Sequence, residues 1–153
     1  MFNEYRKMID DALDTVNQET LNKVFAAFNA FHKYTVIVFG NGGSAAISDH
    51  WMCDHMKCCR TDTPMKSQVR NLAANMSLIT AIANDMSYDQ IFSKQIEWCN
   101  ENEAIVVAIS SSGSSPNIVN GLKAARAKNY SSIAIVGLET LLSMLAELFV
   151  LSL

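Results

Sequence analysis

Short apolar runs alternate along this chain with longer stretches in which apolar residues recur at helical spacing. An uninterrupted run rich in β-branched residues is typical of a strand buried on both faces, because such a strand has no solvent side to carry polar residues. A short mixed segment and an apolar C-terminal segment complete the set of predicted strands. The predicted strands are Thr35–Phe39, Gln68–Leu72, Ala104–Ile109, Ser131–Val136 and Leu148–Leu151.

The segments between these runs predict helices. The second of them places Leu21, Val24, Phe25, Phe28 and Phe31 on one broad apolar face. Asn84-Asp85 interrupts the helical pattern, Arg60–Pro64 is rich in turn residues, and Pro116 suits the first turn of a helix. The predicted helices are Asn3–Thr15, Glu19–His32, Ala45–Cys59, Met76–Ala83, Tyr88–Cys99 and Asn117–Lys128.

Alternation of strands and helices predicts an α/β fold, a parallel sheet with helices on both faces. We expect a flavodoxin-like three-layer α/β/α sandwich with strand order 2-1-3-4-5, preceded by the N-terminal helices. In that order the sheet reverses direction between the first and third strands. Ligands bind in the crevice at the carboxyl ends of those two strands.

Two Ser/Gly-rich segments follow the predicted first and third strands. The first loop is Gly40-Asn41-Gly42-Gly43-Ser44-Ala45, and the second loop is Ser110-Ser111-Ser112-Gly113-Ser114-Ser115. Each leads into a predicted helix, so hydroxyls and backbone N–H groups gather at a positive helix end that favours an anion, most often a phosphate. Ser/Gly segments also form ordinary turns. Convergence of both loops on one crevice nevertheless favours a phosphorylated ligand held from two sides.

Composition narrows the function classes. The 153 residues are half hydrophobic with two prolines, which indicates one folded domain. A formal net charge of −3 offers no basic surface for nucleic acid or an acidic membrane. Charged residues within Met1–Asp14 are unlike a signal peptide, and the apolar Leu141–Leu153 is too short to span a bilayer. We therefore expect a cytoplasmic protein with no nucleic-acid or membrane partner.

Four cysteines are present: Cys53, Cys58, Cys59 and Cys99. They form no Cys-x-x-Cys pair, and adjacent cysteines rarely bond to one another. We interpret them as reduced, partly buried thiols, with a structural zinc site as the alternative.

The motifs together resemble the sugar isomerase (SIS) domain family and, within it, the phosphoheptose isomerases. The resemblance extends from Val36 to about Gly137. Its parts are Gly-Asn-Gly-Gly-Ser at 40–44, Thr-Ala-Ile-Ala-Asn-Asp at 80–85, Ile-Phe-Ser-Lys-Gln at 91–95 and Ile-Ser-Ser-Ser-Gly at 109–113. The family also contains non-catalytic sugar-phosphate sensors and proteins that bind replication initiators.

The resemblance implies a substrate site. Serine hydroxyls and loop amides suit a phosphate because they donate hydrogen bonds without carrying a full charge. A flexible polar loop is the alternative for the serine run, and a turn or helix cap is the alternative for Asn84-Asp85. The implied substrate-binding residues are Gly42, Gly43, Ser44, Asn84, Asp85, Ser110, Ser111, Ser112 and Ser115.

His50 and Asp54 stand four residues apart on the helix after the first loop, so they share a helix face. The resemblance implies that both bind zinc and that Asp54 also serves as the catalytic base, with Asp85 as a second catalytic residue. Asp54 occupies a position where the family has a glutamate, which is one methylene longer. An ordinary surface hydrogen bond is the alternative for such a pair. We expect no such role for His55 or His32.

The implied reaction is the aldose–ketose isomerisation of sedoheptulose 7-phosphate to D-glycero-D-manno-heptose 7-phosphate, for the heptose precursors of lipopolysaccharide or capsule. The family forms homotetramers. We expect residues 1–34 to form a helical segment that packs on the domain and at the oligomer interface, and residues 35–153 to form the SIS domain.

The chain ends before the C-terminal helix that supplies a glutamine and a histidine in the phosphoheptose isomerases, so we expect better binding than turnover. Two alternatives stay open. One is a non-catalytic SIS module that binds a sugar phosphate or docks a protein. The other is a defective isomerase fragment that folds only by oligomerising.

Overall fold

The computed structural model describes residues 1–14, 17–30, 34–137 and 149–152. Five strands, all parallel, form one sheet in this part of the chain, in the order β2-β1-β3-β4-β5. The strand order predicted from the sequence is confirmed, and each predicted strand lies within one residue of the observed one. The strands are β1 (Thr35–Gly40), β2 (Gln68–Asn71), β3 (Ala104–Ser110), β4 (Ser131–Val136) and β5 (Phe149–Ser152).

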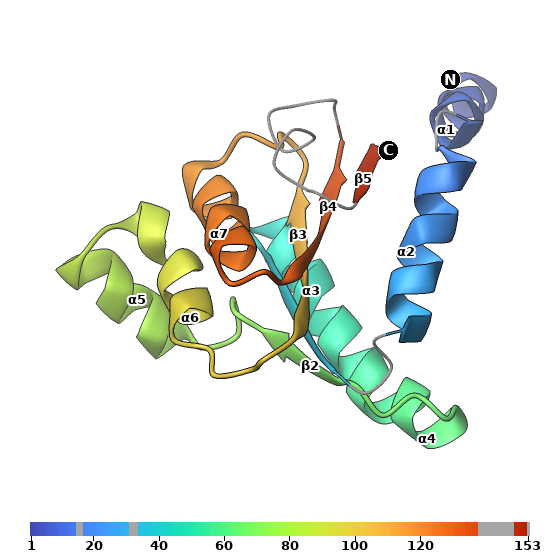
Figure 1. Cartoon of the computed structure of the whole chain (residues 1–153). Coiled ribbons are helices and arrows are strands. Elements are labelled where there is room, and N and C mark those ends of the chain that lie inside the picture. Colours follow the sequence, from blue (N-terminus) through green and yellow to red (C-terminus); the bar gives the residue numbers. More distant parts are fainter. Residues whose placement is uncertain (15–16, 31–33, 138–148, 153) are drawn as a thin grey trace.

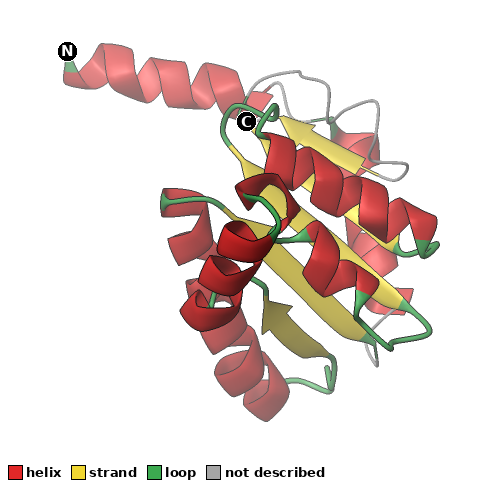
Figure 2. Ribbon diagram, turned by 90° about the vertical axis from the view of Figure 1, so that its left-hand side faces the viewer, coloured by secondary structure: helices red, strands yellow, loops and turns green. Residues whose placement is uncertain are grey.

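Helices cover both faces of the sheet, which gives three layers (Figure 1). Helices α5, α6 and α7 lie on one face, in front of the strands in Figure 2, and α2 and α3 lie on the other. The helices are α1 (Phe2–Asp14), α2 (Gln18–Ala30), α3 (Gly43–Asp54), α4 (Arg60–Asp62), α5 (Met76–Asp85), α6 (Ser93–Glu97) and α7 (Pro116–Ala127). A π-helical turn, His55–Cys59, joins α3 to α4, and a 3₁₀ turn, Tyr88–Gln90, precedes α6.

Alternate residues along each central strand point into opposite layers of the core. Ile37 and Phe39 of β1 point into the layer formed with α5, α6 and α7, whereas Val36 and Val38 point into the layer formed with α2 and α3. All four are at most 1% exposed. Burial on both faces explains why β1 reads as a continuous apolar run.

Three helix predictions are wrong in detail. Residues 60–62 of the expected linker are helical; the hydroxyls of Thr61 and Thr63 donate to the carbonyls of Lys57 and Cys59, and the chain leaves the helix just before Pro64. The expected helix over 88–99 is split into the 3₁₀ turn and α6. Helix α5 continues through Asn84 and Asp85, past the break expected after Ala83.

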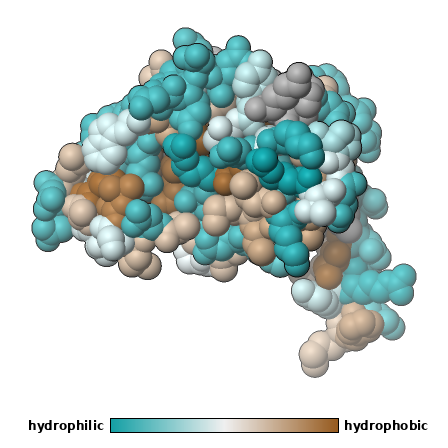
Figure 3. Space-filling model, turned by 90° about the horizontal axis from the view of Figure 1, so that it is seen from below, coloured by the Kyte–Doolittle hydropathy of each residue, from teal (hydrophilic) through white to brown (hydrophobic). Residues whose placement is uncertain are grey.

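The two N-terminal helices differ in their contacts. In α2, Val24 and Ala27 are buried, and the Phe28 ring lies 6.0 Å from that of Trp51. Phe25, expected on the buried face, is 59% exposed. Helix α1 projects from the body and forms the arm at the lower right of Figure 3, with Tyr5 and Met8 exposed. Neither helix, nor any other in the described residues, is long and apolar enough to cross a membrane.

Candidate functional site

The two Ser/Gly loops lie next to each other at the carboxyl edge of the sheet. Strands β1 and β3 are hydrogen-bonded neighbours, and Gly40 at the end of β1 pairs with Ile109 near the end of β3. Because both strands run in the same direction, the first loop and the second loop leave the sheet side by side. The predicted convergence of the two loops is confirmed.

Glycines shape the first loop. A Cβ atom on Gly40 would lie 2.6 Å from Ser44 Cβ and 2.9 Å from the Ile109 carbonyl oxygen, so only glycine allows α3 to fold back so closely on the strand. Gly42 has a φ of 52°, in the left-handed region that glycine adopts readily. Helix α3 then begins at Gly43, and the amides of Ser44 and Ala45 donate to the Asn41 carbonyl.

The second loop is braced by its own serines. Ser110 is buried, and its hydroxyl accepts a hydrogen bond from the amide of Gly113, 3.1 Å away. The Ser112 hydroxyl accepts one from the Ser114 amide at 3.4 Å. Ser115 is the N-cap residue of α7, and its carbonyl accepts from the amides of Ile118 and Val119. Ser110 therefore braces the loop, and its predicted contact with a ligand stays a prediction.

Two asparagine side chains connect the loops. Asn41 Nδ2 donates to Asn117 Oδ1 at 2.9 Å, and Asn117 Nδ2 donates to Asn41 Oδ1 at 2.8 Å. The Tyr88 hydroxyl also donates to Asn41 Oδ1, at 3.3 Å. Sequence reasoning did not select Asn117; its only signal was the Ser115-Pro116-Asn117 helix start. We call Asn41 and Asn117 the amide pair.

A cavity of about 200 Å³ opens where the two loops meet the end of β4. We call it the serine hollow. The hydroxyls of Ser44, Ser111 and Ser115 make no hydrogen bond to any residue that the structure describes, so they are available to a ligand. The hollow is lined by Ser44, Ile47, Ile109, Ser110, Ser111, Ile135, Val136 and Gly137.

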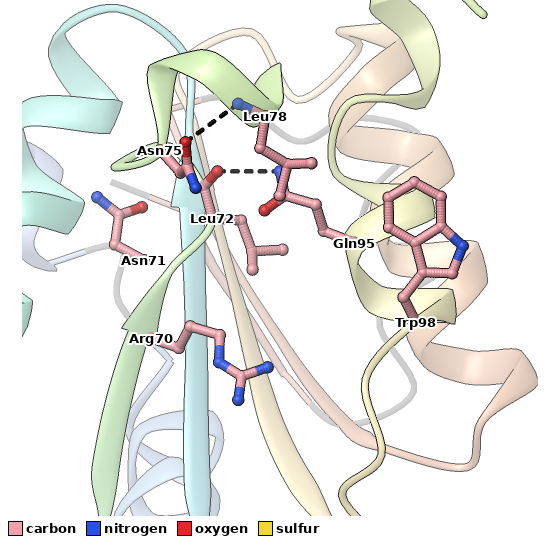
Figure 4. Close-up of a pocket in the computed structure, with 7 residues that line it drawn as sticks. All are labelled: Arg70, Asn71, Leu72, Asn75, Leu78, Gln95 and Trp98. Carbon is pink, nitrogen blue, oxygen red and sulfur yellow. Dashed lines mark hydrogen bonds between the residues drawn. The ribbon is translucent and has the colours of Figure 1, made fainter. Parts of the chain in front are cut away.

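Two further cavities lie nearer β2. One, of about 330 Å³, runs along the other side of the first loop, between Gly40–Gly42 and helix α5, with Tyr88 and Phe92 in its wall. The other, of about 340 Å³, lies between β2 and α6 (Figure 4). Its only charged lining residue, Arg70, is paired with Glu101 at 2.6 Å. None of the residues predicted for catalysis or substrate binding lines this last cavity.

His50 and Asp54 form the expected pair on α3. His50 Nε2 and Asp54 Oδ2 are 3.4 Å apart, and the side chains are 78% and 56% exposed. Helical spacing places both on the stripe of α3 that begins with Gly43 and Ile47, and Ile47 lines the serine hollow. The pair thus follows the hollow along the same helix face.

Imidazole and carboxylate are ligands that zinc accepts, and a protein zinc site uses three or four such groups. No cluster of three or more His, Cys, Asp or Glu side chains suited to a metal occurs among the described residues. His50 and Asp54 therefore fit zinc as half of a ligand set. The four cysteines are free thiols; Cys99 is buried and Cys59 half-buried, whereas Cys53 and Cys58 are exposed.

Asn84 and Asp85 lie at the C-terminal end of α5, both exposed. Asn84 Nδ2 donates to Asp85 Oδ1 at 2.8 Å. Neither residue lines the serine hollow or either of the cavities near β2. Ala83, the residue before Asn84, lines the cavity along the other side of the first loop, so the substrate role of this pair stays a prediction.

His55 is turned away from the site. It is 5% exposed, and its Nε2 lies 2.8 Å from the hydroxyl of Ser67, which is also buried. Burial, with a smaller effect from nearby Arg60, lowers the pKa of His55. These contacts indicate that it stabilises the π-helical turn after Asp54. His32 lies outside the described residues.

Comparison with known proteins identifies the family of this chain. The model of the SIS domain family matches residues 3–137. A probable phosphoheptose isomerase of Thermoplasma acidophilum is 39% identical over 116 residues, which make up 76% of this chain and 62% of that protein. A phosphoheptose isomerase of Colwellia psychrerythraea is 36% identical over 104 residues, 68% of this chain and 53% of the relative. This chain thus spans less than two thirds of either relative.

Among solved structures, phosphoheptose isomerase GmhA from Neisseria gonorrhoeae aligns with a TM-score of 0.81 and 27% identity, over 99% of this chain and 80% of that chain. A phosphoheptose isomerase from Francisella tularensis aligns with a TM-score of 0.73 at 22% identity, a likeness of fold. The flavodoxin-like α/β/α sandwich of the SIS family is confirmed.

Proposed function

Because this chain belongs to the SIS domain family, with residues 3–137 matching the family model, we propose that it is a phosphoheptose isomerase whose substrate is sedoheptulose 7-phosphate. The observation that carries the proposal is the meeting of two hydroxyl-bearing loops at the carboxyl ends of β1 and β3. Relatives that bear the name phosphoheptose isomerase support this choice of reaction.

In this proposal the phosphate lies in the serine hollow. The free hydroxyls of Ser44, Ser111 and Ser115 donate to its oxygens, and the N-terminal ends of α3 and α7 stabilise its charge. From the family resemblance we also assign Gly42 and Gly43 to the backbone that contacts the ligand; Gly42 lines the cavity on the other side of the first loop. Ser110 and Ser112 hold the second loop in shape through their bonds to Gly113 and Ser114.

The reacting end of the sugar then lies beside His50 and Asp54. From Ser44 to His50 the helix advances six residues, about 9 Å at 1.5 Å per residue. An open-chain sugar anchored by its phosphate extends along α3 in the same direction. Asp54 is therefore placed to work at the carbonyl end of the sugar.

The isomerisation moves one proton between neighbouring carbons. Asp54 takes a proton from C1 of the ketose, and the electrons shift through a C1–C2 double bond to the C2 carbonyl oxygen to give an enediolate. The proton of the O1 hydroxyl passes to O2, and delivery of a proton to C2 then yields the aldose. We assign Asp85 as a second polar contact to the sugar, together with Asn84; this requires α5 or a second copy of the chain to bring them to the hollow.

His50 Nε2 and Asp54 Oδ2 are the atoms that would hold a zinc ion. When bound, zinc supplies Lewis-acid stabilisation of the enediolate oxygen. We also propose, from the family resemblance, a cytoplasmic homotetramer that serves surface-glycan heptose synthesis, with residues 1–34 at the subunit interface. The exposed apolar side chains of α1 support that last assignment.

A non-catalytic sugar-phosphate module is the second candidate. It is favoured by one observation: the described residues bring only two metal-type side chains together beside the loops, and both are exposed. Such a module binds the sugar phosphate and does no proton transfer.

Proton NMR of sedoheptulose 7-phosphate in heavy water, with the purified protein and added zinc, separates the two. The isomerase proposal predicts an aldoheptose phosphate, with deuterium entering at C2 of that product and, by the reverse reaction, at C1 of the ketose. Binding of the sugar phosphate by folded protein without exchange above buffer would contradict the isomerase proposal and favour the module.

A further inference from the structure

The amide pair joins segments that are 76 residues apart in the sequence, directly at the junction of the two loops. We propose that Asn117 is a positioning residue, which fixes the first loop relative to the second so that Ser44 and Ser111 face one ligand. This inference rests on the proposed sugar-phosphate site. It assigns Asn117 no contact with substrate.

The geometry of the pair is suited to that task. Each amide donates one hydrogen bond and accepts one, so the two side chains form a closed ring of two bonds at 2.9 and 2.8 Å. Two bonds between planar groups fix orientation as well as distance, whereas a single bond leaves a hinge. The side chain of Asn117 is 1% exposed, so water does not compete for these bonds.

Each partner is also tied to its own segment. Asn117 Oδ1 accepts a further bond from the Ile118 amide, at 3.0 Å, which anchors the side chain to the first turn of α7. The Asn41 carbonyl accepts from the amides of Ser44 and Ala45, which open α3. The amide pair therefore couples the start of α3 to the start of α7, and these are the two helix ends that face the phosphate.

The sheet alone does not fix this coupling. The register of β1 and β3 sets the bases of the loops at Gly40 and Ile109. Beyond those residues the chains leave the sheet, and the amide pair links the residue after Gly40 to the second residue of α7. The Tyr88 hydroxyl, 3.3 Å from Asn41 Oδ1, adds a contact from a third segment.

The test compares Asn117→Ala, Asn41→Ala and the double variant, with Asn120→Ala as matched control. Asn120 lies on α7 too, one turn after Asn117, and its side chain donates to the Asp89 carbonyl at 3.1 Å and to neither loop. Binding of sedoheptulose 7-phosphate is measured by calorimetry, and kcat and KM are measured wherever turnover is found.

We expect each single variant to bind sedoheptulose 7-phosphate about tenfold more weakly than the parent protein. The double variant should lose no more affinity than the more affected single variant, because the two side chains act as one unit. Asn120→Ala should bind like the parent protein. Where turnover is measured, KM should rise with a smaller change in kcat. Effects that multiply in the double variant, or parent-like binding by Asn117→Ala, would overturn the inference.

A ligand-free readout keeps this inference separable from the proposed function. In ¹H–¹⁵N spectra without ligand, Asn117→Ala should shift the amides of Gly42, Gly43 and Ser44, and Asn41→Ala should shift those of Ser111 and Ser112. Should the parent protein bind no sugar phosphate, the proposed function fails and these shifts still decide the coupling. If Asn117→Ala does not fold, Asn41→Ala carries the test, and unshifted second-loop amides contradict the inference.

Discussion

The two edges of the sheet differ in whether their polar side chains have hydrogen-bond partners within the protein. At the carboxyl edge, the hydroxyls of Ser44 and Ser111 in the serine hollow, and that of Ser115 at the start of α7, make no hydrogen bond to any described residue. At the amino edge, polar groups are paired with one another by hydrogen bonds and an ion pair. There Lys128 Nζ donates to the Cys99 carbonyl at 2.6 Å, and the Tyr130 hydroxyl donates to that of Glu101.

The amino edge is a structural network. Arg70 pairs with Glu101 Oε1 at 2.6 Å and donates to Cys99 Sγ at 3.3 Å. Glu101 Oε2 is the one buried side-chain oxygen or nitrogen without a partner in the described residues. Paired groups hold the segments that enter β3 and β4, whereas hydroxyls at the other edge have no protein partner among the described residues. The difference supports the proposed ligand site at the carboxyl edge.

The largest expected effect comes from the carboxylate of Asp54. Asp54→Asn removes the proposed base, so kcat should fall by about 10²–10⁴-fold. Affinity for the sugar phosphate should change little, because the phosphate is held by the loops. Steady-state kinetics and calorimetry measure the two quantities.

Asp62→Asn is the control for Asp54→Asn, since Asp62 is an exposed carboxylate further along the same helical stretch. It should leave kcat unchanged. Equal turnover by Asp54→Asn and the parent protein would show that Asp54 is not the base.

A smaller effect is expected where the first loop folds back on β1. Gly40→Ala places a Cβ 2.6 Å from Ser44 Cβ and should destabilise the protein by about 1–3 kcal/mol, as overpacking does. Sugar-phosphate binding should weaken as well, because Ser44 must move. Urea unfolding reports the stability.

The matched control is Gly43→Ala, since a Cβ there meets nothing within 4 Å. Gly43 is the first residue of α3, so alanine should leave the free energy of unfolding unchanged or raise it slightly. Equal destabilisation by the two variants would show that close packing is not what requires glycine at position 40.

The smallest effect is expected at the amino edge. Burial, reinforced by the Glu101 carboxylate and opposed by Arg70, raises the pKa of Cys99 above its ordinary 9.0. The neutral thiol is favoured in the folded protein, so this contribution to stability is complete below pH 9.0. It is lost as the pH rises from 9.0 through the higher folded-state pKa.

Urea unfolding between pH 8 and 10.5 should therefore show a decline that Cys99→Ser makes shallower. Burial also raises the pKa of Tyr130, so some decline should remain in that variant. Cys58→Ser changes an exposed thiol and should keep the full decline. If stability declined as steeply with pH in Cys99→Ser as in the parent protein, the buried thiol would not be the source of the decline.

The sequence predicted the central strands well because β1, β3 and β4 are mostly apolar and largely buried on both faces, and topology then placed both loops at one edge. Packing between distant segments was harder to foresee. Phe25 fits an apolar helix face, yet the sheet is covered by Val24, Ala27 and Phe28 of α2 and leaves Phe25 exposed.

The candidate site, like the fold, was predictable only in part from the sequence. The loops and the His50–Asp54 pair follow from local spacing and from the family resemblance. The amide pair has no local signature, because its two residues lie 76 positions apart and each resembles an ordinary loop or helix-start asparagine. Asn84 and Asp85 match the family motif, yet the described fold leaves them apart from the serine hollow.

The central claim is that the two loops form one phosphate site. Titration of ¹⁵N-labelled protein with sedoheptulose 7-phosphate, followed by ¹H–¹⁵N spectra, tests it most directly. The account predicts that amides of the first loop (Gly42–Ala45) and the second loop (Ser111–Ser115) shift together, with one dissociation constant and one equivalent per chain. Shifts confined to one loop, or separate dissociation constants for the two loops, would contradict it.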